Sequence, residues 1–248
     1  MIIAELLEER GIIARGLAHP VIFQSPRRTP GIQSSDSDPF GNDLFQKFGA
    51  VMVTPRNYYR LLQTGQNALL FPGGVREVFH GKDESYQLFW PEKVDFVRTA
   101  ARHNATIIPI SAVGAADSLN VLMDAPDVAK LPFGIGRRAL EANANITAAR
   151  FDQDNEQELF TPPVVVPARP ARHYFVFGRA MSTKELDHKD MQSCEELYRD
   201  VQNELNRGFA DILEARKKDP YADPLRRLAH EQLLGKKAPT FAISELNR

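Results

Sequence analysis

The chain has 248 residues, and its 31 Lys and Arg against 32 Asp and Glu leave a net charge of −1. This length suits one large domain with its own core, and the near-neutral charge gives no electrostatic case for nucleic-acid binding. No apolar run approaches the roughly 20 residues that a membrane-spanning helix needs. The single cysteine, Cys194, excludes an intramolecular disulfide.

The first half of the chain alternates short apolar runs with segments of helical periodicity. Apolar spacing predicts a helix over 2–10 that ends at Gly11, and apolar runs predict strands at 12–14, 21–23, 51–53 and 69–71. Thr54 is placed to cap a helix over 55–64, with Pro55 in its first turn and Gly65 after its end. The segment 25–43 is rich in Pro, Ser, Asp and Gly, which favours a loop.

The second half continues the alternation before a long helix. We expect a helix over 91–102, strands over 106–110, 112–113 and 173–178, and an amphipathic helix over 194–217. Between them, 131–170 is less regular; its acidic block at 152–158 is more typical of a solvated loop than of a metal site. The last thirty or so residues are expected to pack loosely, except where Leu225 and Phe241 anchor them.

This order predicts an α/β fold in which a single sheet is flanked by helices. The short, nearly continuous apolar strands favour a largely parallel arrangement, with the strands near Val21, Val51, Leu69, Ile107 and Phe175 in one sheet. The expected domain covers 1–218, and 219–248 form a C-terminal tail.

The segment Phe71 to Glu77, with the sequence FPGGVRE, is the strongest candidate for a polar site. A strand ends at Pro72, which cannot donate to a ladder, and two glycines then allow close approach to the backbone. Arg76 and Glu77 follow as a cation and an anion. Such a strand end is a common place for a binding site, although a plain turn with solvated charges explains the pattern equally well.

Other chemistries do not fit the spacing of the residues. Six residues, not four, lie between Gly74 and Gly81, and Lys82 is followed by Asp83, which excludes a Walker phosphate loop. No Gly-x-Ser-x-Gly occurs. One cysteine and no close histidine pair exclude a zinc site, and a lone Cys194 on a helix is more typical of packing than of a nucleophile. We therefore expect no metal and no cofactor.

The chain resembles the lysophospholipid/glycerolipid acyltransferase superfamily, within it the phytyl ester synthase and diacylglycerol acyltransferase-like group of plants and algae. The resemblance rests on FPGGVREV at 71–78, on 84–102 and on 105–117, with weaker support from 14–23, 48–62, 173–178 and 237–241. It covers most of the chain in order. The fold that it implies is a glycerolipid acyltransferase-like α/β domain.

The resemblance also implies an acceptor-binding role for particular residues. Phe71, Pro72, Gly74 and Arg76 match the superfamily's acceptor block. Gly73 stands where a glutamate is usual, which fits the diacylglycerol acyltransferase-like branch and a neutral acceptor, and Glu77 matches that branch's acid. Arg56 resembles the arginine of a second block, although a solvated residue of a helix's first turn explains it equally well.

The catalytic motif of the superfamily, His-x4-Asp, is absent, because none of the six histidines has Asp five positions later. His19 and His80 remain as weak candidates for a general base, and a structural role is favoured for His19. The family pattern would place the motif just ahead of Met1. We therefore expect a chain that begins inside the domain, N-terminally truncated and weak or inactive as written.

The function implied is O-acyl transfer from acyl-CoA or acyl-carrier protein to a lipid alcohol, such as diacylglycerol or a phytol-like alcohol, as in phytyl ester or triacylglycerol biosynthesis. The alternative is a non-catalytic lipid-binding or interaction remnant of the same domain. The expected location is peripheral, on a membrane or lipid-droplet surface, and the family resemblance implies the chloroplast.

Overall fold

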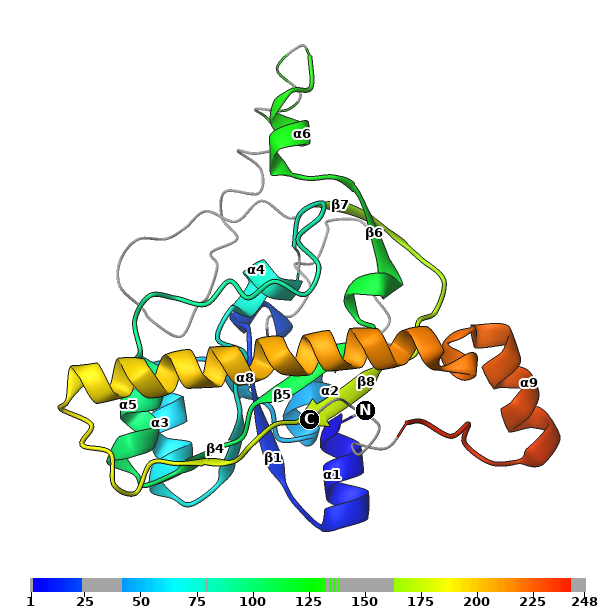
Figure 1. The fold of residues 1–248 in the computed structure, drawn as a ribbon. Coiled ribbons are helices and arrows are strands. Elements are labelled where there is room, and N and C mark those ends of the chain that lie inside the picture. The colour runs from blue at the N-terminus through cyan, green and yellow to red at the C-terminus, as the bar shows by residue number, and fades with distance from the viewer. Residues whose placement is uncertain are drawn as a thin grey trace.

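The computed structural model describes residues 2–23, 42–78, 80–132, 134, 136, 138 and 163–241. Within this part the protein is a mixed α/β fold with a body of strands and helices and a projection above it (Figure 1). The candidate loop segment 25–43 lies almost wholly outside the described residues, and the acidic block 152–158 lies entirely outside them.

A three-stranded parallel sheet forms the N-terminal part of the body. Its order is β2-β1-β3, with β1 over Ala14–Ala18, β2 over Val51–Met52 and β3 over Asn67–Leu69. Helix α1 (Ile2–Arg10) precedes β1, α2 (Asn42–Lys47) precedes β2, and α3 (Pro55–Gln63) connects β2 to β3. Because all three strands are parallel, their carboxyl ends lie at one edge of the sheet.

A two-stranded antiparallel ribbon forms the second part. One arm runs through β4 (Thr106–Ile107), β5 (Ile110–Val113) and β6 (Leu119–Met123). The other arm returns through β7 (Val164–Pro167), β8 (Tyr174–Phe177) and β9 (Met181–Ser182). Single backbone hydrogen bonds bridge the gaps between paired stretches: Gly178 N–H donates to Pro109 O at 2.8 Å, and Ala168 N–H to Ser118 O at 2.9 Å.

The ribbon changes direction at Gly114. This residue has φ +120°, and a Cβ there would lie 2.3 Å from the carbonyl oxygen of Arg172, so only glycine fits. After it come the 3-10 turn η2 (Ala116–Ser118) and β6, which with β7 carries the chain up to α6 (Ala125–Ala129) in the projection (Figure 1).

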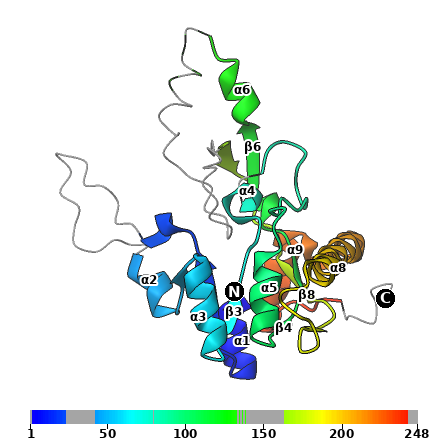
Figure 2. The same cartoon turned by 90° about the vertical axis from the view of Figure 1, so that its left-hand side faces the viewer.

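Helix α8 (Met191–Lys218) lies along the ribbon and closes the core. Figure 2 shows α3 and α5 (Asp95–Arg102) on one side of β4 and β8 and α8 on the other. Beside α8, Trp90, Phe96 and Tyr198 pack edge to face or tilted at 5.4–5.5 Å between ring centroids. Cys194 is fully buried in this cluster, and burial raises the pKa of its thiol. The thiol therefore keeps its proton, which fits a packing role.

The predicted helices are confirmed with small changes at their ends. The N-terminal helix has the predicted bounds, and Thr54 caps α3 by accepting from Asn57 N–H at 3.1 Å. Helix α5 begins at Asp95 rather than at residue 91, and α8 begins three residues before Cys194.

The prediction of one continuous sheet is wrong. Among the described strands the hydrogen bonds form a three-stranded sheet and three separate two-stranded ladders. In the described part of the chain, the N-terminal sheet is parallel and the later pairings are antiparallel. The segment around Val21 is a 3-10 helix, η1 (Pro20–Phe23), because Pro20 cannot extend the ladder of β1 as a donor.

Residues 219–241 have more regular structure than their sequence indicates. A 3-10 turn (η3, Pro220–Ala222) and helix α9 (Pro224–Leu234) follow α8. Phe241 is an anchor as predicted, because its ring stacks on Tyr174 at 5.4 Å between centroids. Leu225 is not an anchor, since its side chain is 75% exposed.

Candidate functional site

The turn after β3 is built around two glycines. Phe71 is 55% exposed, whereas Pro72 and Gly73 are buried. Gly74 has φ +55°, a left-handed conformation that favours glycine, and its N–H donates to Phe71 O at 3.0 Å. The short helix α4 (Gly74–Val78) begins at this residue.

Glu77 lies folded back over Gly73. A Cβ on Gly73 would lie 2.1 Å from the carboxyl carbon Cδ of Glu77, so the missing side chain makes room for the carboxylate. The Oε1 atom of Glu77 accepts a hydrogen bond from Phe89 N–H at 3.0 Å. The acid of the motif therefore joins the turn to a residue twelve positions further along the chain.

Arg76 makes the second link across the same loop. Its guanidinium donates to both carboxylate oxygens of Glu84, at 2.7 Å each, and lies 3.9 Å from the ring centroid of Phe89. Glu84 also accepts from Gly81 N–H at 2.5 Å. The hydrogen bonds from Arg76 and Gly81 lower the pKa of Glu84, with Arg76 as the larger cause.

We call residues 71–89 the Gly-Gly loop. Arg76 and Glu77 both have partners inside it, so their contacts hold its shape. The loop also exposes two apolar side chains, since Phe71 is 55% and Val78 61% exposed.

Tyr86 ties the Gly-Gly loop to the rest of the molecule. Its hydroxyl accepts from Gly114 N–H at 3.1 Å and donates to Asp117, which also accepts from Arg216 of α8. Burial, followed by the bond to Asp117, raises the pKa of the Tyr86 phenol. Lys82 adds an exposed ion pair with Asp127 at 2.6 Å.

The sheet topology brings two other sequence-predicted residues to the same edge. Arg56 follows the end of β2, in the first turn of α3, and is exposed. His19 follows the end of β1, the middle strand, and the Gly-Gly loop follows the end of β3. With neighbouring strands about 4.8 Å apart, the carboxyl edge of this sheet presents all three segments side by side.

His80 lies within the Gly-Gly loop itself. Its Nδ1 is 2.9 Å from the carbonyl oxygen of Gly81. A carbonyl only accepts, so the bond places the proton of the neutral ring on Nδ1 and leaves the lone pair on Nε2. His103, by contrast, packs edge-on against Tyr59 at 4.5 Å, and burial, with the nearby Arg102, lowers its pKa.

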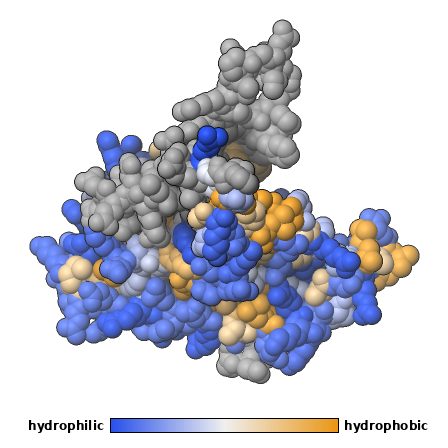
Figure 3. Space-filling view, turned by 90° about the horizontal axis from the view of Figure 1, so that it is seen from above, coloured by the Kyte–Doolittle hydropathy of each residue, from blue (hydrophilic) through white to orange (hydrophobic). Residues whose placement is uncertain are grey.

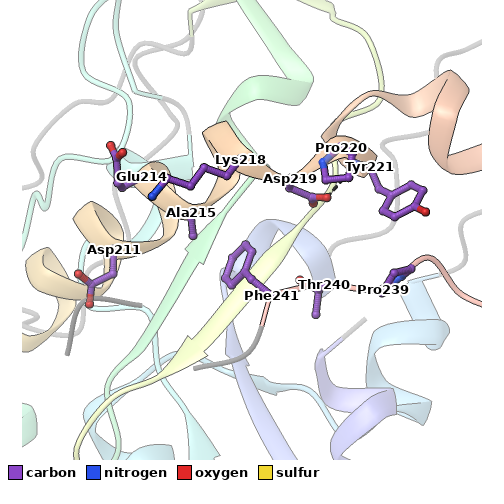
Figure 4. Close-up of a pocket in the computed structure, with 10 residues that line it drawn as sticks. All are labelled: Asp211, Glu214, Ala215, Lys218, Asp219, Pro220, Tyr221, Pro239, Thr240 and Phe241. Atoms are coloured by element: carbon purple, nitrogen blue, oxygen red, sulfur yellow. Dashed lines mark hydrogen bonds between the residues drawn. The ribbon is translucent and has the colours of Figure 1, made fainter. Parts of the chain in front are cut away.

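Two cavities lie elsewhere, around the C-terminal end of α8. One, of about 270 Å³, is an open pocket lined by the end of α8, by the turn that follows it and by the segment 239–241; Figure 4 shows the ring of Phe241 pointing toward α8 near Ala215. The other, of about 610 Å³, is lined by Arg172, Tyr174 and Arg216 among others. The sequence-predicted site residues line neither cavity, so their role as a binding site stays a prediction.

Sequence reasoning missed the contacts around Arg172 as a group, although it singled out 173–178 and 237–241 separately. Arg172 pairs with Asp219 at 3.1 Å and donates to Ala238 O at 2.7 Å and to Pro239 O at 2.8 Å. Asp219 also accepts from Tyr174 OH at 2.5 Å. The two segments are thus parts of one anchor for the chain's C-terminal residues.

The part of the chain that the structure describes contains no group of three or more His, Cys, Asp or Glu side chains suited to a metal ion. In the same part, no helix is both long enough and apolar enough to cross a membrane.

Two curated proteins of Arabidopsis thaliana match this chain. Phytyl ester synthase 2, chloroplastic, is 35% identical over 97% of the chain, and phytyl ester synthase 1, chloroplastic, is 34% identical over 90%. The chain spans about a third of the length of these relatives, 34% and 31% respectively. No family model matches it, and no solved structure matches it.

The described residues form a mixed α/β fold in which the Gly-Gly loop follows the parallel strand β3. Over nearly all of its length the chain is similar to these two phytyl ester synthases, and this similarity supports the phytyl ester synthase-like group.

Proposed function

We propose that this chain is the acyltransferase-like portion of an enzyme that moves a fatty acyl group onto a lipid alcohol. The observation that carries the proposal is the similarity to two phytyl ester synthases over 97% and 90% of the chain. The donor is a thioester, either acyl-CoA or acyl-carrier protein, and the acceptor is a phytol-like alcohol or diacylglycerol. The chloroplastic relatives support a location in the plastid.

Within this proposal the carboxyl edge of the parallel sheet receives the acceptor. The exposed side chains of Phe71 and Val78 offer apolar contact to a lipid chain. Arg76 and Glu77 act through their bonds to Glu84 and Phe89 and fix the position of that apolar surface. Arg56, at the same edge, is a candidate for contact with the polar end of the acceptor.

The chemistry requires a base that removes the proton of the attacking hydroxyl. The resemblance implies that this base is a histidine held by an aspartate in a His-x4-Asp motif, and this sequence contains no such motif. A base of this kind is worth roughly 10²–10⁴-fold in rate. We therefore propose that the chain as written transfers acyl groups poorly. The alternative proposal is a non-catalytic lipid-binding portion, which the missing motif favours.

The test compares the purified chain with a version extended at its N-terminus by a segment that carries His-x4-Asp. Each form is assayed with acyl-CoA and with acyl-carrier protein donors, and with phytol and diacylglycerol as acceptors. We expect transfer by the extended form and at least about 100-fold less by the chain as written.

Equal activity of the two forms would locate the base within these 248 residues and make His19 and His80 its candidates. If the extended form is folded and inactive, and both forms bind the alcohol, the non-catalytic alternative holds. Single substitutions His19→Ala and His80→Ala in the chain as written separate the two histidines.

A further inference from the structure

Helix α9 is capped at both ends, yet it contributes no buried residue. Asp223 accepts from Leu225 N–H at 2.8 Å and from Arg226 N–H at 2.9 Å, and Gly235 ends the helix with φ +60°. Helix α9 lies beyond the end of α8, at one extremity of the body (Figure 1). An isolated helix of eleven residues is marginal in water, so this one needs a partner surface for its stability.

The apolar side of α9 faces outward. Its leucines are among the most exposed hydrophobic side chains described, at 75% for Leu225, 54% for Leu228, 83% for Leu233 and 60% for Leu234. In the space-filling view, hydrophobic side chains gather at the end of the molecule where α9 lies (Figure 3).

The polar side of α9 faces the body. The ring of His230 packs on Tyr221 at 4.7 Å between centroids, and its Nδ1 lies 3.0 Å from the Tyr221 hydroxyl. Glu231 Oε1 accepts from Ala238 N–H at 3.2 Å. These polar contacts fix the helix with its leucines turned away from the core, the reverse of the usual orientation of a surface helix.

The charges beside the leucines are mostly positive. Residues 224–237 hold Arg226, Arg227, Lys236 and Lys237 but a single acid, Glu231, although the whole chain carries −1. Arg226, Lys236 and Lys237 are exposed. An outward apolar face bordered by cations is the pattern of a helix that lies in the interface of a membrane with anionic lipids.

We propose that α9, together with residues 235–237, docks the protein onto a bilayer that carries anionic headgroups. The leucines enter the boundary between headgroups and acyl chains, and the cations meet the negative surface. The choice of a lipid surface rests on the proposed function, because a lipid alcohol is delivered from such a surface.

The test measures sedimentation of the full chain with vesicles of phosphatidylcholine alone and of phosphatidylcholine mixed with phosphatidylglycerol. We expect binding to the mixed vesicles that weakens as salt rises, because the headgroup attraction is screened. The double variant Leu225→Asp/Leu233→Asp should bind at least about tenfold more weakly. Both leucines are exposed, so its circular dichroism and thermal midpoint should match those of the unchanged chain.

A matched control places the same charge on another exposed leucine. Leu122 of β6 is 52% exposed, and Leu122→Asp should bind vesicles like the unchanged chain. A second variant, Lys236→Gln/Lys237→Gln, leaves the helix intact and should lose the preference for phosphatidylglycerol. The lysine variant keeps the proposal testable if the leucine variant is unstable.

Absence of vesicle binding, or equal binding by the unchanged chain and both variants, would overturn the proposal. So would a dimer in solution that the leucine variant dissociates, since the face would then be covered by a second copy. Vesicle binding requires no acyl transfer, so failure of this proposal and failure of the proposed enzyme activity give different results.

Discussion

The guanidinium of Arg76 and the carboxylate of Glu84 form a paired contact across the Gly-Gly loop, with both N–O distances at 2.7 Å. The two side chains are 26% and 29% exposed, so water screens the pair only partly. This pair gives the arginine of the motif a structural task.

The variant Glu84→Gln removes one charge of this pair and weakens the bond to Gly81. We expect a loss of about 1–2 kcal/mol in the free energy of unfolding, which is about 2–8 °C in thermal midpoint for a chain of this size. The control Glu214→Gln affects an exposed pair with Lys217 and should leave the midpoint unchanged. Equal midpoints for all three proteins would show that the pair contributes nothing.

The same variant should alter stability in acid. The folded-state pKa of Glu84 lies below its usual value, so its contribution is present above about pH 4.3 and is lost as the pH falls through the lower, folded value. In urea unfolding between pH 6 and pH 3, Glu84→Gln should therefore lose less stability than the unchanged chain. Parallel curves would contradict this assignment.

Gly73→Ala should disrupt the loop through Glu77. The added Cβ would lie 2.1 Å from Glu77 Cδ, so the carboxylate must move and release Phe89 N–H. We expect a loss of about 1–3 kcal/mol. The same change in a Glu77→Ala background should cost much less, because the clash is gone. Gly16→Ala, whose Cβ would lie 3.5 Å from Ile3 Cδ1, is the steric control. Additive effects of the two substitutions would rule out this contact.

Tyr174→Phe should change the response to alkaline pH. Burial, followed by the bond to Asp219, raises the pKa of the Tyr174 phenol, and burial raises that of Tyr58. The folded protein keeps these protons while the unfolded chain releases them above about pH 10, so stability falls as the pH rises past that point. The phenylalanine variant should be less stable at pH 8 and should show a shallower decline between pH 9 and pH 11 in urea titrations. An unchanged slope would refute the assignment.

Phe71→Ser tests the acceptor surface in the extended form of the enzyme. Because Phe71 is 55% exposed, the thermal midpoint should stay within about 1 °C, while apparent KM for the lipid alcohol should rise several-fold. KM for the acyl donor serves as the internal control. An unchanged KM for the alcohol, or equal rises for both substrates, would remove Phe71 from the acceptor site.

Local sequence signals predicted the helices of this protein well. Thr54 followed by Pro55 defines the start of α3, and Gly11 follows the end of α1, because caps act through backbone groups only a few residues away. The glycine pair at 73–74 likewise predicted a turn, and Gly74 has a positive φ, which glycine adopts without steric cost.

Strand pairing was not predictable in this way. The prediction of one largely parallel sheet failed because β4, β5 and β6 pair with β9, β8 and β7 across about forty intervening residues, and an apolar run does not encode its partner or direction. The strands β6 and β7 were missed because they are only five and four residues long and because prolines flank the valines of β7.

The sequence by itself determined the helix ends and the glycine turn, and its similarity to two phytyl ester synthases supports the phytyl ester synthase-like group. Only the tertiary structure decided what the charged residues do. The partner of Arg76 lies eight residues away across a loop, and that of Arg172 lies 47 residues away, so neither pair forms within one helix or strand. Likewise, α9 has an ordinary amphipathic pattern, and only the contacts of His230 and Glu231 with the body turn its leucines outward. Long-range polar contacts depend on where the whole chain places its segments, which is why they could not be predicted from local patterns.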